Sequence, residues 1–155
     1  MDFNKYYMNI AMEVAKKSKD PSSKVGCVIV DKENRLVSTG FNGFVSKCDE
    51  QMMTIERPLK YHFTIHAEMN ALIFARENLF GCTVYTTHGP CDNCLKHLLQ
   101  AGIRTIIYDD PIIMQQRGTD DQKNAITRLI LSTEATVVNI NNNYDYYKEL
   151  TRNVK

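Results

Sequence analysis

Four residues have types and spacings that suit metal-dependent chemistry. His66 and Glu68 form the motif H-x-E, and Cys91 and Cys94 form P-C-x-x-C. Two thiolates at this spacing, where a loop passes into a helix, can bind one metal ion, because a helix N-terminus lowers the pKa of a thiol. The cysteine pair alone is ambiguous among a zinc half-site, a redox pair and two unrelated thiols. The imidazole of His66 is a third potential ligand, and its presence favours a metal site over the other two explanations.

His66 begins one predicted helix and the cysteine pair begins the next, with a single predicted strand between them. The N-termini of such successive helices lie at one edge of a sheet, beyond the carboxyl ends of its strands. Three protein ligands leave a fourth position open for water, as in catalytic zinc sites, and sulfur with nitrogen suits zinc. Glu68 is then placed to take a proton from a zinc-bound water, whose pKa is about 7.

Each of these residues also has an ordinary structural explanation. A histidine at a helix start is often a cap, and Glu68 in a first turn suits the helix dipole. Among the other histidines, His97 follows Cys94 by three residues on the same helix and is the strongest competitor as a ligand. The remaining competitors are His62 and His88. Three cysteines are expected to have no chemical role, and these are Cys27, Cys48 and Cys82.

Composition bounds the class of protein. The chain has 155 residues, 43% of them hydrophobic, and a net charge of +1, which suits one globular domain and does not indicate a nucleic-acid partner. No apolar run approaches a membrane span, and residues 1–20 do not read as a signal peptide. Five cysteines, an odd count without a secretory signal, argue against a disulfide framework. We expect a cytoplasmic protein, in the host cytoplasm if it is viral.

The hydrophobic pattern predicts alternating helices and strands. A first helix starts after Asp2 and stops at Asp20-Pro21, and residues 41–60 form a long loop. The expected strands are 25–30, 35–40, 82–87, 103–109 and 136–140. The remaining expected helices are 65–78, 94–101, 120–135 and 144–153. This order predicts one domain over 1–155. Its expected fold is a three-layer α/β/α sandwich with a five-stranded, mostly parallel sheet that the initial hairpin makes mixed.

The sequence resembles a known family at these motifs. H-A-E followed by P-C-x-x-C is the signature of the zinc-dependent cytidine deaminase superfamily. Further blocks over roughly residues 1–110 look like deoxycytidylate (dCMP) deaminases, cellular and phage. These blocks are SKDPSSKVGCVIV, STGFNGF, HAEMNALIFA, GCTVYTTHGPCDNC and AGIRTIIYDD.

The resemblance implies roles for the residues that match the family. One catalytic zinc is held by His66, Cys91 and Cys94. Hydroxide attacks C4 of the cytosine and Glu68 moves the protons, so that dCMP becomes dUMP and ammonia is released. The dUMP then serves dTTP synthesis. The implied substrate contacts are the side chain of Asn42, the backbone N–H of Ala67, and Lys24, Val25 and Tyr108. Residues 51–60 contain neither Cys nor His, so no second zinc is expected.

Finer properties are implied by the same resemblance. Relatives of this kind are often homo-hexamers that dCTP and dTTP regulate. A 5′-phosphate needs cationic donors, and the candidates are Lys24, Lys47, Arg57, Lys60 and Arg104. Two alternatives remain open. One is another deaminase of the superfamily, acting on dCTP, cytidine, cytosine or a nucleic-acid base. The other is a zinc-binding module without catalysis.

Overall fold

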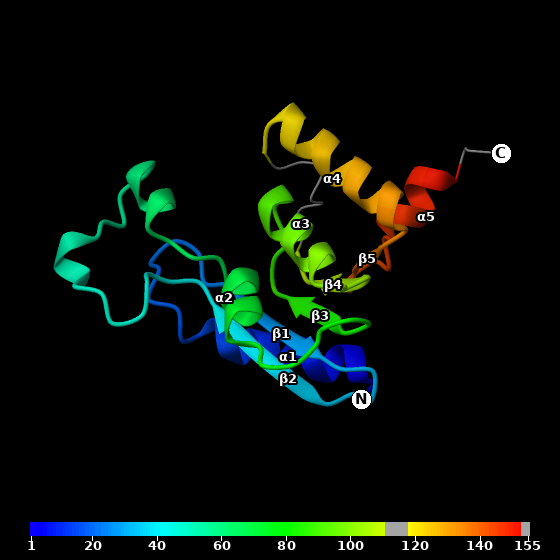
Figure 1. Ribbon diagram of the computed structural model, residues 1–155, viewed down its shortest axis with the longest axis horizontal. Helices are drawn as coiled ribbons and strands as arrows, with labels where there is room; N and C mark the ends of the chain where they lie inside the picture. Colours follow the sequence, from blue (N-terminus) through cyan, green and yellow to red (C-terminus); the bar gives the residue numbers. More distant parts are fainter. Residues whose placement is uncertain (111–117, 153–155) are drawn as a thin grey trace.

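The computed structural model describes residues 1–110 and 118–152, which form a sheet with helices on both faces (Figure 1). The helices are α1 (Phe3–Ala15), α2 (Ala67–Phe74), α3 (Asp92–Gln100), α4 (Asp120–Thr133) and α5 (Tyr146–Thr151). The strands are β1 (Gly26–Val30), β2 (Leu36–Phe41), β3 (Thr83–Thr86), β4 (Thr105–Tyr108) and β5 (Thr136–Asn139). Two short 3-10 helices, η1 (Glu50–Met52) and η2 (Leu59–His62), lie in the predicted long loop. None of the described helices is long and apolar enough to cross a membrane.

The five strands are arranged in the order β2-β1-β3-β4-β5. Strand β1 is antiparallel to both β2 and β3, and β3, β4 and β5 run parallel to one another. The mixed five-stranded sheet is confirmed. It is less parallel than predicted, because β1 pairs antiparallel with β3 as well as with its hairpin partner. As a consequence β2 and β3 point the same way, and their carboxyl ends lie at one edge.

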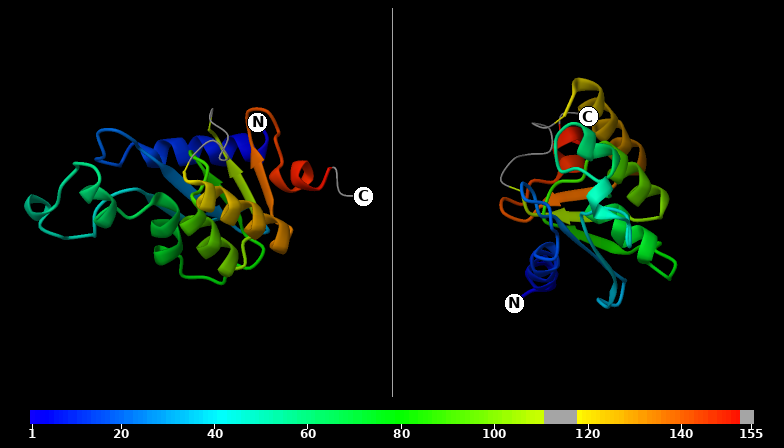
Figure 2. Two further views of the ribbon diagram at one scale, coloured as in Figure 1. Left: turned by 90° about the horizontal axis from the view of Figure 1, so that it is seen from above. Right: turned by 90° about the vertical axis from the view of Figure 1, so that its left-hand side faces the viewer.

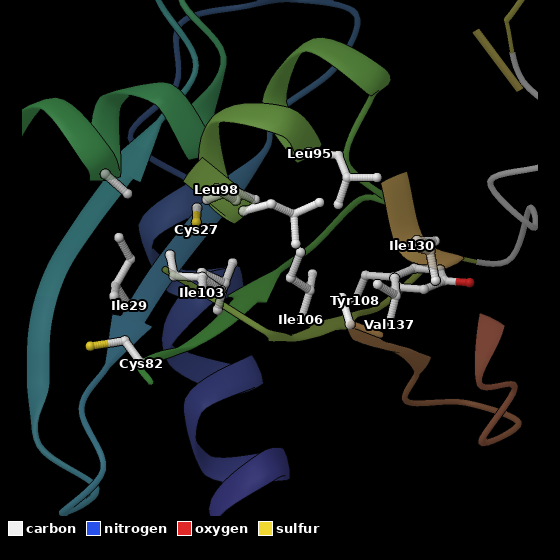
Figure 3. Close-up of a cluster of buried hydrophobic side chains, with 14 of the residues drawn as sticks. Cys27, Ile29, Cys82, Leu95, Leu98, Ile103, Ile106, Tyr108, Ile130 and Val137 are labelled. Atoms are coloured by element: carbon white, nitrogen blue, oxygen red, sulfur yellow. The ribbon is translucent and has the colours of Figure 1, made fainter. Parts of the chain in front are cut away.

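Side chains of β1 alternate between two buried faces. Cys27 and Ile29 belong to the larger core, which α2, α3, α4 and α5 help to close, while Val28 and Val30 pack with residues of α1. A strand covered on both faces is apolar throughout, which explains the run Gly26–Val30. The three-layer sandwich is therefore confirmed, with α1 alone on one face (Figure 2). The larger core also contains the buried thiol of Cys82 (Figure 3).

Several helices are shorter than predicted. Helix α1 is capped by Asp2, whose side chain accepts the N–H of Lys5, as expected, but it ends at Ala15. Helix α2 ends at Phe74, well before residue 78, and the chain then leaves the helix and reaches Leu79, which is buried in the larger core. Helix α3 begins before the second cysteine of the pair, and the predicted end of the last helix at residue 153 lies outside the described residues.

Helix α2 lies unusually close to β2 at Gly40. A Cβ at Gly40 would lie 2.3 Å from the carbonyl oxygen of Ala67 and 2.4 Å from the backbone nitrogen of Ala71. The hydroxyl of Ser38 donates a 2.8 Å hydrogen bond to the carbonyl of Ala71 on the same helix. These contacts fix the position of α2, and therefore of the residues at its start.

The long segment between β2 and α2 projects beyond the sheet (Figures 1 and 2). Its base is narrow, because Gly43 and Ile65 exchange backbone hydrogen bonds of 3.1 and 2.8 Å. The prediction of a loop is confirmed for most of this segment, with η1 and η2 as its regular parts. The loop therefore leaves and re-enters the fold beside the start of α2.

Replacing Gly40 tests the close approach of α2. We expect Gly40→Ala to lower the free energy of unfolding by about 1–3 kcal/mol, as overpacking does, because its methyl group would meet helix backbone. Thermal and urea unfolding measure this change. The matched control is Gly43→Ala, where an added Cβ has no heavy atom within 4 Å. Equal stability of the two variants would contradict the packing described.

Candidate active site

The two helix starts present side chains that sequence motifs predicted. His66 is the N-cap residue of α2, but its side chain makes no capping hydrogen bond, so the imidazole is not occupied by the helix. Cys91 is the N-cap residue of α3, and its sulfur accepts the N–H of Cys94 at 3.5 Å. The explanation of His66 as a simple cap is therefore wrong. Both helices start beyond the carboxyl ends of β2 and β3, at the predicted edge.

Three potential metal-binding atoms meet at this edge. The Nδ1 of His66 lies 3.6 Å from the Sγ of Cys91 and 3.3 Å from the Sγ of Cys94. All three atoms lie within 4.8 Å of one another. One nitrogen and two sulfurs are compatible with a single zinc ion that keeps an open position. His97, the strongest competitor, instead places its Nδ1 2.6 Å from the carbonyl of Asn93 and is not in this cluster.

The cluster shifts the ionisation of its own members. A hydrogen bond from Cys94 and the neighbouring His66 lower the pKa of the Cys91 thiol to about 4, against the effect of burial. The hydrogen bond to Cys91 and burial raise the pKa of Cys94. The hydrogen bond with Cys91, aided by nearby negative charge, raises the pKa of His66. Without a cation, therefore, the two sulfurs do not both ionise, and a bound metal ion would stabilise both as thiolates.

Glu68 is buried beside the cluster, with 4% of its surface exposed. Its Oε1 accepts a 3.1 Å hydrogen bond from the hydroxyl of Thr86, which is fully buried at the end of β3. The charge of Glu68 contributes to the raised pKa values of both His66 and Cys94. Sequence reasoning missed Thr86, although its position at the carboxyl end of a predicted strand places it at the same edge.

A cavity of about 230 Å³ opens onto the cluster. It is lined by the predicted site residues His66, Glu68, Cys91, Val25, Asn42 and Ala67. A second group of polar side chains lines the same cavity, and its members are Asp20, Ser23, Arg57, Lys60 and Tyr61. The cavity therefore joins the metal cluster to a region that contains both acidic and basic side chains.

Asn42 shapes the wall of this cavity. Its side-chain oxygen accepts the N–H of Val25 at 2.9 Å, and its side-chain nitrogen donates to the carbonyl of Ser23 at 2.8 Å. Asn42 directly follows β2, so one side chain ties the end of that strand to the start of β1. A substrate contact by the side chain of Asn42 would use its remaining N–H or the second lone pair of its oxygen.

Two predicted contact residues lie elsewhere. Tyr108 is fully buried in the larger core (Figure 3). Its ring centroid lies 6.5 Å from that of Tyr146. Side chains alternate along β4, and Tyr108 faces the core. Lys24 is exposed and is not among the residues that line the cavity. The structure therefore does not bring Lys24 or Tyr108 to the cluster.

The loop before Cys91 is also held by a residue that follows β4. The backbone N–H of Gly89 donates to a carboxylate oxygen of Asp110 at 3.2 Å, and Asp110 is almost fully buried. His88 and Gly89 both line the cavity. Asp110 follows β4 and was not singled out from the sequence, because nothing local marks its contact with a loop that precedes it by about twenty residues.

Removing one thiol tests the metal cluster. We expect Cys91→Ser and Cys94→Ser to lose most of their zinc, because a serine hydroxyl does not ionise near neutral pH and is a poor zinc ligand. Elemental analysis of the purified proteins measures zinc per chain, with one ion expected in the wild type. Cys48→Ser is the matched control, since Cys48 is outside the cluster. Two zinc ions per wild-type chain would contradict a single site.

Comparison with known proteins also supports a zinc site in this protein. Residues 1–109 match the family described as "Cytidine and deoxycytidylate deaminase zinc-binding region". A deoxycytidylate deaminase from Mus musculus is 34% identical over 137 residues, covering 84% of this chain and 74% of that relative. An uncharacterized deaminase in the luxG 3′ region of Aliivibrio fischeri is 45% identical over 102 residues, 66% of this chain and 69% of that protein.

A solved structure is similar over most of its length. The dCMP deaminase of cyanophage S-TIM5 in apo form superposes with a TM-score of 0.67 at 26% identity, covering 90% of this chain and all of the phage chain. The same phage enzyme was also solved in complex with dCMP and dUMP. By the extent of these matches, the chain belongs to the zinc-binding cytidine and deoxycytidylate deaminase family.

Proposed function

We propose that this protein is a zinc-dependent deaminase that converts dCMP and water to dUMP and ammonia. The observation that carries this proposal is the meeting of His66, Cys91 and Cys94 with the buried carboxylate of Glu68 at one cavity. A site that only bound zinc would have no use for a buried carboxylate beside an open coordination position. The named relatives in mouse and cyanophage act on dCMP by their descriptions.

The proposed mechanism assigns proton transfer to Glu68. His66, Cys91 and Cys94 would hold the zinc, which when bound would lower the pKa of a water near the base. Glu68 accepts a proton from that water and delivers it to N3 of the cytosine, while the remaining hydroxide forms a bond to C4. Glu68 then moves the remaining hydroxyl proton to the amino nitrogen, so that the bond between C4 and this nitrogen breaks and ammonia leaves. The hydroxyl of Thr86 holds one carboxylate oxygen at 3.1 Å and so limits the positions that Glu68 can adopt.

The base is expected to lie against the first turn of α2. Ala67 lines the cavity and has a small side chain, so its backbone N–H can approach the edge of a pyrimidine. Val25 and Asn42 form the adjoining wall. The region with Arg57 and Lys60 supports a phosphorylated substrate, because it supplies cations to the same cavity.

We further propose that residues 1–155 act as a single domain in a cytoplasmic homo-oligomer, a hexamer by analogy with the family, which supplies dUMP for dTTP synthesis. Exposed apolar side chains support an oligomer, since Ile73 and Phe74 at the end of α2 are 60% and 58% exposed. Regulation by dCTP and dTTP is supported by a second cavity of about 720 Å³, whose lining includes Lys17 and Lys47.

A panel of substrates tests the proposed specificity. We expect dCMP to have the highest kcat/KM among dCMP, CMP, dCTP, deoxycytidine and cytosine, because the cavity offers both the metal cluster and cations. Loss of cytosine absorbance follows each reaction. Repeating the dCMP assay with dCTP and then with dTTP tests regulation. A different best substrate would refute dCMP as the natural one.

Replacement of Glu68 tests its catalytic role. We expect Glu68→Gln to retain zinc and lower kcat by about 100-fold or more, the usual contribution of a general acid–base group. Elemental analysis and the dCMP assay give the two measurements. Glu13→Gln is the control, because the side chain of Glu13 is 72% exposed on α1. Wild-type turnover by Glu68→Gln would argue for a zinc-binding module without this chemistry.

A further inference from the structure

A buried ion pair lies in the cavity wall apart from the metal cluster. The Nζ of Lys60 is 3.1 Å from the Oδ2 of Asp20, and their side chains are only 6% and 10% exposed. Both residues line the cavity. The ion pair Lys16–Glu13 is by contrast on the surface, with both side chains 72% exposed. Burying an ion pair costs desolvation free energy that its attraction often fails to recover, so stability alone does not explain its presence.

Asp20 has a structural task that uses one oxygen of its carboxylate. Its Oδ1 accepts the N–H groups of Ser22 and Ser23 at 2.9 and 3.0 Å and the hydroxyl of Ser22 at 2.8 Å. Burial opposes ionisation, but hydrogen bonds from Ser22, Lys60 and Ser23 outweigh it and hold the pKa of Asp20 well below its ordinary value. Asp20 therefore carries a negative charge in the cavity wall at neutral pH.

The turn that Asp20 stabilises leads directly to the substrate side of the cavity. Ser23 follows in the wall, and its carbonyl accepts the hydrogen bond from Asn42 that was described above. Asn42 then holds Val25 at the start of β1. The wall consequently carries a carboxylate at Asp20, although the proposed substrate brings a phosphate to the same cavity and like charges repel.

Lys60 resolves this conflict. Its ammonium contacts the Oδ2 of Asp20 and the hydroxyl of Ser22 at 3.0 Å, so it compensates the carboxylate without displacing the turn. Arg57, whose Nη2 lies 3.3 Å from the same hydroxyl, is exposed at the cavity and forms no ion pair with a carboxylate of the described residues. Together Arg57, Lys60 and Asp20 give this part of the wall a net charge of +1. Without Lys60 its net charge would be zero.

We propose that Lys60 determines selectivity for a 5′-phosphorylated nucleotide indirectly, as a positioning residue that compensates the charge of Asp20 in the cavity wall. This inference rests on the proposed dCMP deaminase function. Lys60 is tied to its place from the backbone as well, because its N–H donates to the carbonyl of Glu56 at 2.9 Å and its carbonyl accepts the N–H of Thr64 at 3.0 Å. The projecting loop thus delivers one buried cation to the wall.

The test compares two substrates in zinc-loaded full-length protein. The quantity measured is kcat/KM for dCMP divided by kcat/KM for deoxycytidine, which lacks the phosphate. We expect Lys60→Met to lower this ratio about tenfold or more, through a higher KM for dCMP with kcat changed less than about threefold, because an uncompensated carboxylate then faces the phosphate. Zinc content and thermal unfolding confirm that the variant is folded.

The double variant Lys60→Met/Asp20→Asn separates compensation from direct contact. It lacks both charges of the Lys60–Asp20 pair, and an amide oxygen at position 20 can still accept the N–H groups of Ser22 and Ser23. We expect its selectivity to return to within about threefold of wild type. If it stays as low as in Lys60→Met, Lys60 contacts the phosphate itself and the inference is overturned. The double variant also decides the question if Lys60→Met does not fold.

Two further results complete the design. Lys16→Met removes a lysine from the exposed pair with Glu13 and should leave the ratio unchanged. A wild-type protein that does not deaminate dCMP would refute the proposed function and this inference together. A wild type that deaminates dCMP, combined with unchanged selectivity in Lys60→Met, would refute only the role of Lys60.

Discussion

The chemistry of this protein depends on how closely α2 can lie against the sheet. Gly40 has no side chain, so the backbone of α2 approaches β2 at a distance that a Cβ would prevent. The N-cap residue of α2 is His66, whose imidazole must meet two sulfurs at the start of α3. A shift of α2 away from the sheet would carry His66 and Glu68 together, and both the metal ligand and the proton carrier would be misplaced. Packing in the sheet therefore sets the geometry of the reaction.

Topology supplies the other half of this arrangement. Because β1 is antiparallel to both of its neighbours, β2 and β3 end at one edge, and the chain leaves each of them toward a helix start. Thr86 ends β3 and reaches Glu68, while the loop beyond it continues to Cys91. Helix N-termini also favour negative charge, which suits thiolates and a carboxylate. Electrostatics and strand direction thus favour the same place for an N-S-S metal site.

The sequence predicts the cluster well, because each motif is local and the order of strands and helices brings the motifs to one edge. It also predicts the sandwich from periodicity, and the buried thiols of Cys27 and Cys82 from their strands. Contacts between distant segments are not predictable in this way. Lys60 and Asp20 are 40 residues apart, and no pattern marks them as partners. For a related reason the sequence suggested a substrate contact for Tyr108, whose side chain lies in the larger core. A position at the sheet edge does not say which face a side chain occupies.

The long loop links these local and distant features. It starts after Asn42, which ties β2 to the entry of β1, and it closes at Ile65, next to His66. Along the way it places Lys60 against Asp20, so the same excursion builds the wall and reaches the metal cluster. Conserving the fold while changing this loop would leave the deamination chemistry at α2 and α3 in place and alter the charge of the wall. The charge of the wall and the catalytic groups are therefore built on separable elements, of which only the second needs the precise packing at Gly40.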